Sequence, residues 1–166
     1  MKLLQPITLG LSLVFFTLIN TAHADKPDDA DALQGIDTGK VIWDITLSSP
    51  SRLLFVMKVI EETYEDLIEQ HVKPDMVFTF HGRVLKLLSS QPIELDIDEE
   101  VALEELLVLI QELSKKPGIK MESCSVASRI LNIDNSTIIP EVKPVGNTFV
   151  SLIGYQQKGY ALIPIN

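Results

Sequence analysis

The stretch "IKMESCSVASRILNI", residues 119–133, decides the fold and contains the only cysteine of the chain, Cys124. Its first part, residues 119–123, predicts a strand, and residues 124–132 predict a short helix that follows at once. Alternation of strands and helices is typical of α/β proteins with a mostly parallel sheet. The stretch therefore predicts an α/β unit with Cys124 at the junction between its strand and its helix.

The same alternation continues on both sides of this stretch. Four further apolar segments predict strands, and segments of helical periodicity lie between them. The expected fold is an α/β three-layer sandwich with a mostly parallel five-stranded sheet and right-handed crossovers. The other expected strands are residues 40–47, 75–80, 141–145 and 160–165, and the expected helices lie in segments 48–71, 81–90, 98–118, 124–132 and 146–159.

The two long helices have clear signals at their ends. Ser49 is the predicted N-cap of the first, with Pro50 at its first helical position. Asp98 is the predicted N-cap of the second, in which acidic residues come first and lysines last, as the helix dipole favours. The buried stripe expected on this second helix consists of Leu103, Leu106, Leu107, Ile110 and Leu113.

The N-terminal 24 residues have the pattern of a secretory signal peptide. Lys2 provides a positive start, residues 7–19 are apolar, and Ala22-His23-Ala24 matches a cleavage site. The apolar run is shorter than the roughly 20 residues of a membrane-spanning helix. We expect a periplasmic or secreted protein without a stable membrane span. A flexible acidic leader, residues 25–39, would then precede one folded domain, residues 40–166.

Composition and motifs exclude several classes of function. The net charge of −9 and the lack of a basic patch argue against a nucleic-acid partner. No glycine-rich phosphate loop follows the first expected strand, which disfavours nucleotide binding. After signal cleavage, two histidines and one cysteine remain, which are too few for a closed zinc site in one chain. We expect no metal and no cofactor.

A single thiol in an oxidising compartment has three possible states. It is buried and inert, paired with another chain, or kept for chemistry. The position of Cys124 before a helix favours chemistry, because free N–H groups and the helix dipole stabilise a thiolate. The alternative is a small buried cysteine that acts as a hydrophobic side chain.

Other polar residues are expected near Cys124. The carboxyl ends of parallel strands lie at one edge of the sheet, where ligands commonly bind. Two roles are open for His81: it assists Cys124 as proton acceptor or hydrogen-bond donor, or it only caps its own turn. The residues expected at this edge are Thr46, Ser48, Ser49, His81, Gly82, Cys124, Ser125, Gly146 and Asn147.

Between Lys40 and Pro164 the chain resembles the DsrE/DsrF-like sulfur-relay family. The resemblance rests on four pieces in order: "VIWDITLSSPSRLLFVMKVI" (41–60), "VFTFHGRVLKLL" (77–88), the stretch 119–133, and "KGYALIPI" (158–165). It implies a flavodoxin-like topology, a homo-oligomer (trimer or hexamer), and a strand-end cysteine that carries persulfide sulfur between donor and acceptor proteins. Cys124 occupies the place of that cysteine.

The chain departs from the family pattern in two respects. Many members have Arg-Gly after the cysteine helix, where this chain has "RILNI"; Asn132 can take the left-handed conformation in place of glycine. The signal peptide is the second departure, because the well-understood relays work in the cytoplasm.

Three functions therefore stay open. The first is a periplasmic sulfur carrier or thiol-transfer protein that uses Cys124. The second is a non-enzymatic binding or assembly module with an inert cysteine. The third is a peroxide-sensing thiol.

Overall fold

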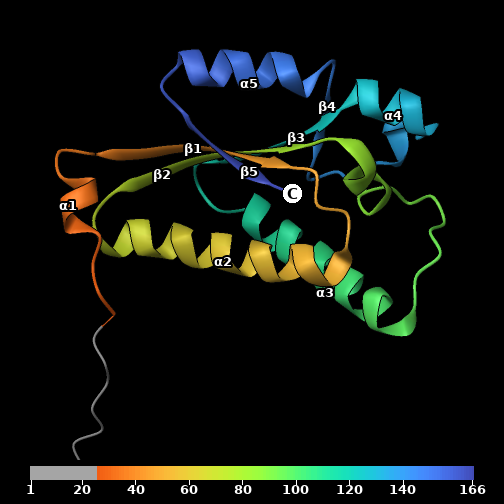
Figure 1. Ribbon diagram of the computed structural model, residues 1–166, viewed down its shortest axis with the longest axis horizontal. Coiled ribbons are helices and arrows are strands. Elements are labelled where there is room, and N and C mark those ends of the chain that lie inside the picture. The colour runs from red at the N-terminus through yellow and green to blue at the C-terminus, as the bar shows by residue number, and fades with distance from the viewer. Residues whose placement is uncertain (1–25) are drawn as a thin grey trace, which may run out of the picture.

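A computed structural model describes residues 26–166, so the expected signal peptide, residues 1–24, lies outside the described residues. Helices and strands alternate along the chain and form three layers (Figure 1). The α/β fold expected from the sequence is confirmed.

The central sheet has five strands, and every neighbouring pair is parallel. Their order is β4-β3-β2-β1-β5, so the first four strands follow one another across the sheet and the last returns to the far edge. This order differs from the 2-1-3-4-5 order of flavodoxin, so the expected flavodoxin-like topology is wrong in its strand order. The strands are β1 Thr38–Ile45, β2 Lys73–Phe80, β3 Ile119–Cys124, β4 Lys143–Val145 and β5 Ala161–Ile165.

Two long helices cover one face of the sheet, α2 (Pro50–Glu69) and α3 (Ile97–Ser114). The opposite face carries α5 (Thr148–Gln157), with α4 (Ser125–Leu131) beside it (Figure 1). Because β4 and β5 lie at opposite edges, α5 crosses the sheet to join them. A short 3-10 helix, η1 (Gly82–Lys86), follows β2.

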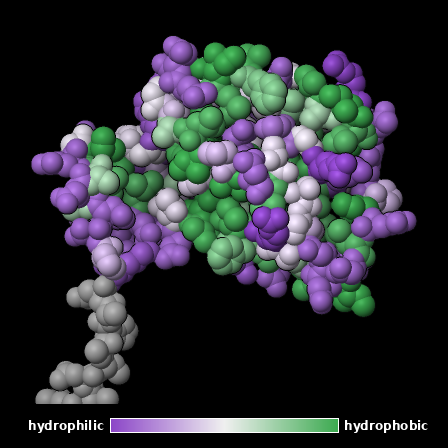
Figure 2. Space-filling view, in the orientation of Figure 1, coloured by the Kyte–Doolittle hydropathy of each residue, from purple (hydrophilic) through white to green (hydrophobic). Residues whose placement is uncertain are grey.

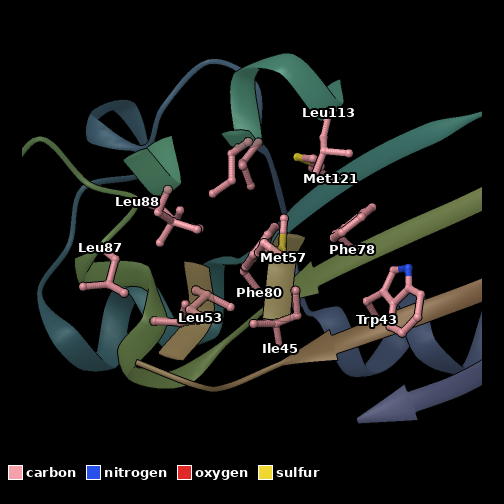
Figure 3. Close-up of a cluster of buried hydrophobic side chains, with 14 of the residues drawn as sticks. Trp43, Ile45, Leu53, Met57, Phe78, Phe80, Leu87, Leu88, Leu113 and Met121 are labelled. Carbon is pink, nitrogen blue, oxygen red and sulfur yellow. The ribbon is translucent and has the colours of Figure 1, made fainter. Parts of the chain in front are cut away.

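The main core lies between the sheet and the two long helices (Figure 3). Trp43, Phe78 and Phe80 project from the strands toward Met57 of α2. The α5 face has a smaller core, in which Ile42, Val77 and Leu152 are packed with Tyr155 and Tyr160. The alternation of side chains along a strand explains the division, since Ile42 lies between Val41 and Trp43 but faces the other way.

Helix α3 confirms most of its predicted buried stripe. Leu106, Ile110 and Leu113 are fully buried, whereas Leu103 and Leu107 are only half-buried at its margin. The predicted N-cap is wrong. Asp96, and not Asp98, has the extended backbone of a cap, and its carboxylate accepts a hydrogen bond from the N–H of Glu99.

The start of α2 and the end of α4 agree with the sequence prediction, whereas the length of β4 does not. Ser49 caps α2 as predicted, by accepting from the N–H of Arg52. Asn132 takes the left-handed conformation, with φ of 55°, and ends α4 as expected. The fourth strand is shorter than residues 141–145, because only Lys143–Val145 pairs with β3; Pro144 lacks an N–H and suits an edge strand.

The segment before β1 makes defined contacts. It contains one helical turn, α1 (Ala30–Leu33), and the ammonium of Lys26 lies 2.6 Å from Glu62 and 2.7 Å from Asp66 of α2. Strand β1 begins at Thr38, two residues before the start expected from the sequence.

Candidate functional site

Cys124 lies at the carboxyl edge of the sheet, as predicted. It is the last residue of β3 and directly precedes α4. Met121 belongs to the core on the α2/α3 face, so alternation places Glu122 and Cys124 on the α5 face. The hydroxyl of Tyr155 in α5 donates to Glu122 over 3.0 Å, which supports this orientation. The thiol therefore lies in the layer between the sheet and α5.

The thiol is free and largely covered, with 5% of Cys124 exposed. Strand pairing brings Cys124 opposite Val145, the last residue of β4. Two residues after Val145, Asn147 caps α5, and Thr148 is the first residue of that helix. The thiol is thus surrounded by the starts of two helices, α4 on its own chain segment and α5 from the neighbouring strand.

These surroundings set the acidity of the thiol. Burial opposes ionisation and is the largest single influence on the pKa of Cys124. The N–H and hydroxyl of Thr148 and the N–H groups of Ala127 and Val126 act in the other direction, because they stabilise the anion. Together they hold the pKa of Cys124 below its ordinary value, as its position at a helix start predicted.

The side chain of His81 is paired with Asp44, whereas the sequence suggested Cys124 as its partner. Its Nε2 lies 3.0 Å from Oδ1 of Asp44 on β1, and the hydroxyl of Thr79 donates to the same oxygen over 3.0 Å. The alternative role, a side-chain cap of its own turn, is wrong, since His81 makes no side-chain cap bond to η1. The imidazole also meets the ring of Phe149 in α5 edge-on, with centroids 5.2 Å apart.

His81 directly follows β2 and Cys124 ends the adjacent β3, on the same face of the sheet. Phe80 pairs with Ser123, so the two site residues follow a matched pair. The hydrogen bond of His81 runs to Asp44 on β1, which lies on the side of β2 away from β3. The imidazole is therefore held next to the start of α5, and its partner in the structure is a carboxylate.

The hydroxyl groups after β1 are occupied elsewhere. The carboxylate of Glu99 in α3 accepts from both the N–H (2.9 Å) and the hydroxyl (2.7 Å) of Ser51, and from the hydroxyl of Ser49 (3.2 Å). The hydroxyl of Thr46 bonds to Asn166 over 2.9 Å. These residues connect α2 to α3 and the chain end to β1, so they serve the fold at this edge.

Two residues of the site were not predicted. Asp44 had a readable signal, since it is a carboxylate inside the otherwise apolar strand segment "VIWDI". Thr148 had no such signal. In the sequence it is an ordinary first-turn residue of a helix, and it comes near Cys124 only because β4 pairs with β3. Within residues 26–166, no group of three or more His, Cys, Asp or Glu side chains could hold a metal ion.

A parallel sheet in the order β4-β3-β2-β1-β5 with one thiol at its carboxyl edge defines the class: a three-layer α/β protein with a single-cysteine site. Residues 40–165 match the model of the DsrE/DsrF-like family. The chain belongs to that family, and the resemblance noted from the four sequence pieces is confirmed.

The chain is also similar to a curated protein and to solved structures. An uncharacterized protein of Aquifex aeolicus (strain VF5) is 22% identical over 125 residues, which are 75% of this chain and 55% of the relative. The chain thus spans about half the length of that relative.

Two solved structures share the fold. The protein of unknown function MTH1491 from Methanobacterium thermoautotrophicum has a TM-score of 0.56 and 17% identity, covering 76% of this chain and 98% of its own. The ychN protein from E. coli has a TM-score of 0.50 and 13% identity, covering 77% and 100%. At these identities the likeness shows the fold alone.

Within residues 26–166, no helix has both the length and the apolar character needed to cross a membrane.

Proposed function

We propose that this chain is an exported sulfur carrier of the DsrE/DsrF type, in which Cys124 accepts persulfide sulfur from one protein and passes it to another. One observation carries the proposal: Cys124 ends β3 between the starts of α4 and α5, where N–H and hydroxyl donors hold its pKa below the ordinary value. A thiolate is the form that attacks a sulfur–sulfur bond.

The chemistry needs no cofactor. The Cys124 thiolate attacks the outer sulfur of a donor persulfide, R–S–SH; the donor bond breaks, the donor leaves as R–S⁻, and Cys124 becomes Cys–S–SH. An acceptor thiolate then attacks the outer sulfur, and Cys124 leaves as a thiolate. Each transfer exchanges one S–S bond for another, so it requires no oxidant or reductant. A lowered pKa makes Cys124 a better leaving group in the second step.

His81 and Asp44 support the site in this proposal. A carboxylate accepts hydrogen bonds, so it favours the tautomer in which Nε2 of His81 carries the proton. This leaves Nδ1 as an acceptor for a proton at the carboxyl edge. The proposed role of His81 is to exchange protons with incoming thiols, and that of Asp44 is to hold the imidazole.

Export and self-association form part of the same proposal. Residues 1–24 have the signal-peptide pattern, and the domain would act in the periplasm after their removal. Figure 2 shows hydrophobic side chains at the surface along α5 and beside α4. Phe149, Val150 and Ile153 of α5 are each more than half exposed. Exposed apolar patches often mark association sites, which supports a homo-oligomer.

A second function is favoured by one observation, the burial of Cys124. A covered thiol suits a binding or assembly module of the same fold in which the cysteine is inert.

Intact mass separates these two functions. The reduced protein is exposed to cysteine persulfide without oxygen, separated from the donor, and weighed; Cys124→Ser is the matched control. The carrier function predicts one added sulfur atom on the wild-type protein, its loss to added glutathione, and none on the variant. A wild-type protein that never gains sulfur while folded identifies the assembly module.

A further inference from the structure

The hydroxyl of Thr148 is a buried polar group without an assigned role. Thr148 is fully buried, and its Oγ1 has no hydrogen-bond partner among the described residues. Buried hydroxyls in proteins are nearly always hydrogen-bonded, because leaving one unpaired costs free energy. A buried threonine in this state calls for a hydrogen-bond acceptor close by.

The backbone of Thr148 is also free to donate. Thr148 is the first residue of α5, a helix of ten residues, and the N–H groups of its first turn lack partners within the helix. Asn147 caps the helix through the N–H of Phe149, over 2.9 Å, and so leaves the N–H of Thr148 available. The N–H and the hydroxyl of Thr148 are therefore both available to a neighbouring acceptor.

That neighbour is Cys124. Pairing of Cys124 with Val145 places the turn at Gly146 and Asn147 beside the thiol, and Thr148 follows directly. Both its N–H and its hydroxyl lie close enough to the sulfur to favour the anion. Oγ1 of Thr148 has no hydrogen-bond partner among the described residues, so it is available to an anionic sulfur.

We propose that Thr148 is a further catalytic residue of this site, whose hydroxyl donates a hydrogen bond to the sulfur of Cys124 when that sulfur is anionic. This inference rests on the proposed function, since it assigns Thr148 to the thiolate that accepts and releases sulfur. The hydroxyl stabilises Cys124 both as attacking thiolate and as leaving group. Hydrogen bonds to charged groups are stronger than those between neutral groups, so the effect falls on the anion alone.

The charged side chains near Cys124 have hydrogen-bond partners of their own. On the α5 face, His81 follows the neighbouring strand and binds Asp44, while Glu122 precedes Cys124 by two residues and binds Tyr155. The influences that lower the pKa of Cys124 are all N–H and hydroxyl donors. Among them, the hydroxyl of Thr148 is the one that a side-chain substitution can remove.

The test compares Thr148→Val, which keeps the shape and removes the hydroxyl, with Thr148→Ser, which keeps the hydroxyl. The rate of alkylation of Cys124 by iodoacetamide is followed against pH in each folded protein. Thr148→Val is expected to raise the titration midpoint by about one unit, or about tenfold less thiolate below the midpoint, whereas Thr148→Ser stays within about twofold of wild type. Thr148→Ala is a second hydroxyl-free variant if the valine variant does not fold.

Two results overturn the inference: Thr148→Val or Thr148→Ala titrating like wild type, or Thr148→Ser shifting as far as they do. The persulfide-loading assay on the same proteins keeps the two claims apart. A shifted midpoint in a protein that never loads sulfur supports Thr148 and ends the carrier function. A wild-type protein that loads sulfur, with an unshifted hydroxyl-free variant, keeps the carrier function and ends the role of Thr148.

Discussion

Asp44 Oδ1 lies 3.0 Å from Nε2 of His81 and accepts a second hydrogen bond from the buried hydroxyl of Thr79. One carboxylate oxygen on β1 therefore holds a side chain of β2 and the imidazole that follows β2 at the carboxyl edge of the sheet. Asp44 and His81 are both only partly exposed, at 18% of each side chain, so the bond is shielded from solvent.

Removal of Asp44 should destabilise the fold. Asp44→Ala leaves the hydroxyl of Thr79 without this acceptor and His81 without its partner, which should reduce the free energy of unfolding by about 1–3 kcal/mol. Urea denaturation measures the change, and Asp44→Asn, which keeps an oxygen acceptor, is the control and should lose less. An alanine variant within about 0.5 kcal/mol of wild type would show that the bond contributes nothing to stability.

The buried face of α3 gives a second test of the structure. Leu106→Ala and Ile110→Ala should each cost about 2–5 kcal/mol, because they leave cavities in the main core. Val108→Ala on the same helix is the control, since Val108 is 59% exposed and should change the free energy of unfolding by less than about 0.5 kcal/mol. Equal effects at the three positions would mean that the register of α3 is wrong.

The free energy of unfolding at alkaline pH should depend on Tyr155. Its partial burial, followed by its hydrogen bond to Glu122, raises the pKa of Tyr155 to about 12. In the unfolded chain the phenol ionises near 10. A group with a raised folded pKa contributes stability that is complete below the unfolded pKa and lost as pH rises through the folded one.

The free energy of unfolding should therefore fall between about pH 10 and about pH 12. Tyr155→Phe removes this ionisation and should make that part of the curve less steep. Part of the slope should remain, because burial and a hydrogen bond to Asp75 also raise the pKa of Tyr160. Absorbance of the phenolate in the native protein is the second readout. Ionisation of Tyr155 near pH 10 in the folded state is incompatible with the bond to Glu122.

Processing of the chain is a further prediction. Residues 1–24 should be removed on export, so the first residue of the native protein should be Asp25. Edman sequencing of protein isolated from the periplasm measures this. Retention of Met1 in a soluble cytoplasmic product would contradict both the location and the argument from an oxidising compartment.

Local sequence patterns predicted the elements of the fold well. Apolar runs and caps such as Ser49 placed the strands and the long helices, and Asn132 was recognised as a left-handed residue. The order of the strands was not predictable in this way, because it depends on where the chain crosses the sheet. The N-cap of α3 was misplaced because "DID" offers two aspartates, Asp96 and Asp98, with equal capping ability.

The site was predicted only in part. Cys124 ends β3 and His81 directly follows β2, so their place at the carboxyl edge could be predicted from the alternation of elements alone. The hydrogen bond of His81 to Asp44 and the contact of Cys124 with Thr148 each join segments that are far apart in the sequence. Such contacts leave little trace in a single sequence, which explains why the role of Thr148 emerged only from the structure, whereas Asp44 leaves one trace, a carboxylate in an apolar strand.

The most direct measurement of the central claim is the rate of alkylation of Cys124 against pH in the folded wild-type protein. A reactive thiolate at this site should be modified without unfolding, with a titration midpoint below the value of about 8.5 for a free cysteine. Modification that occurs only when denaturant unfolds the chain, or a midpoint above that value, would contradict it. The thiol would then be inert, and the domain would be a binding or assembly module of the DsrE/DsrF-like family.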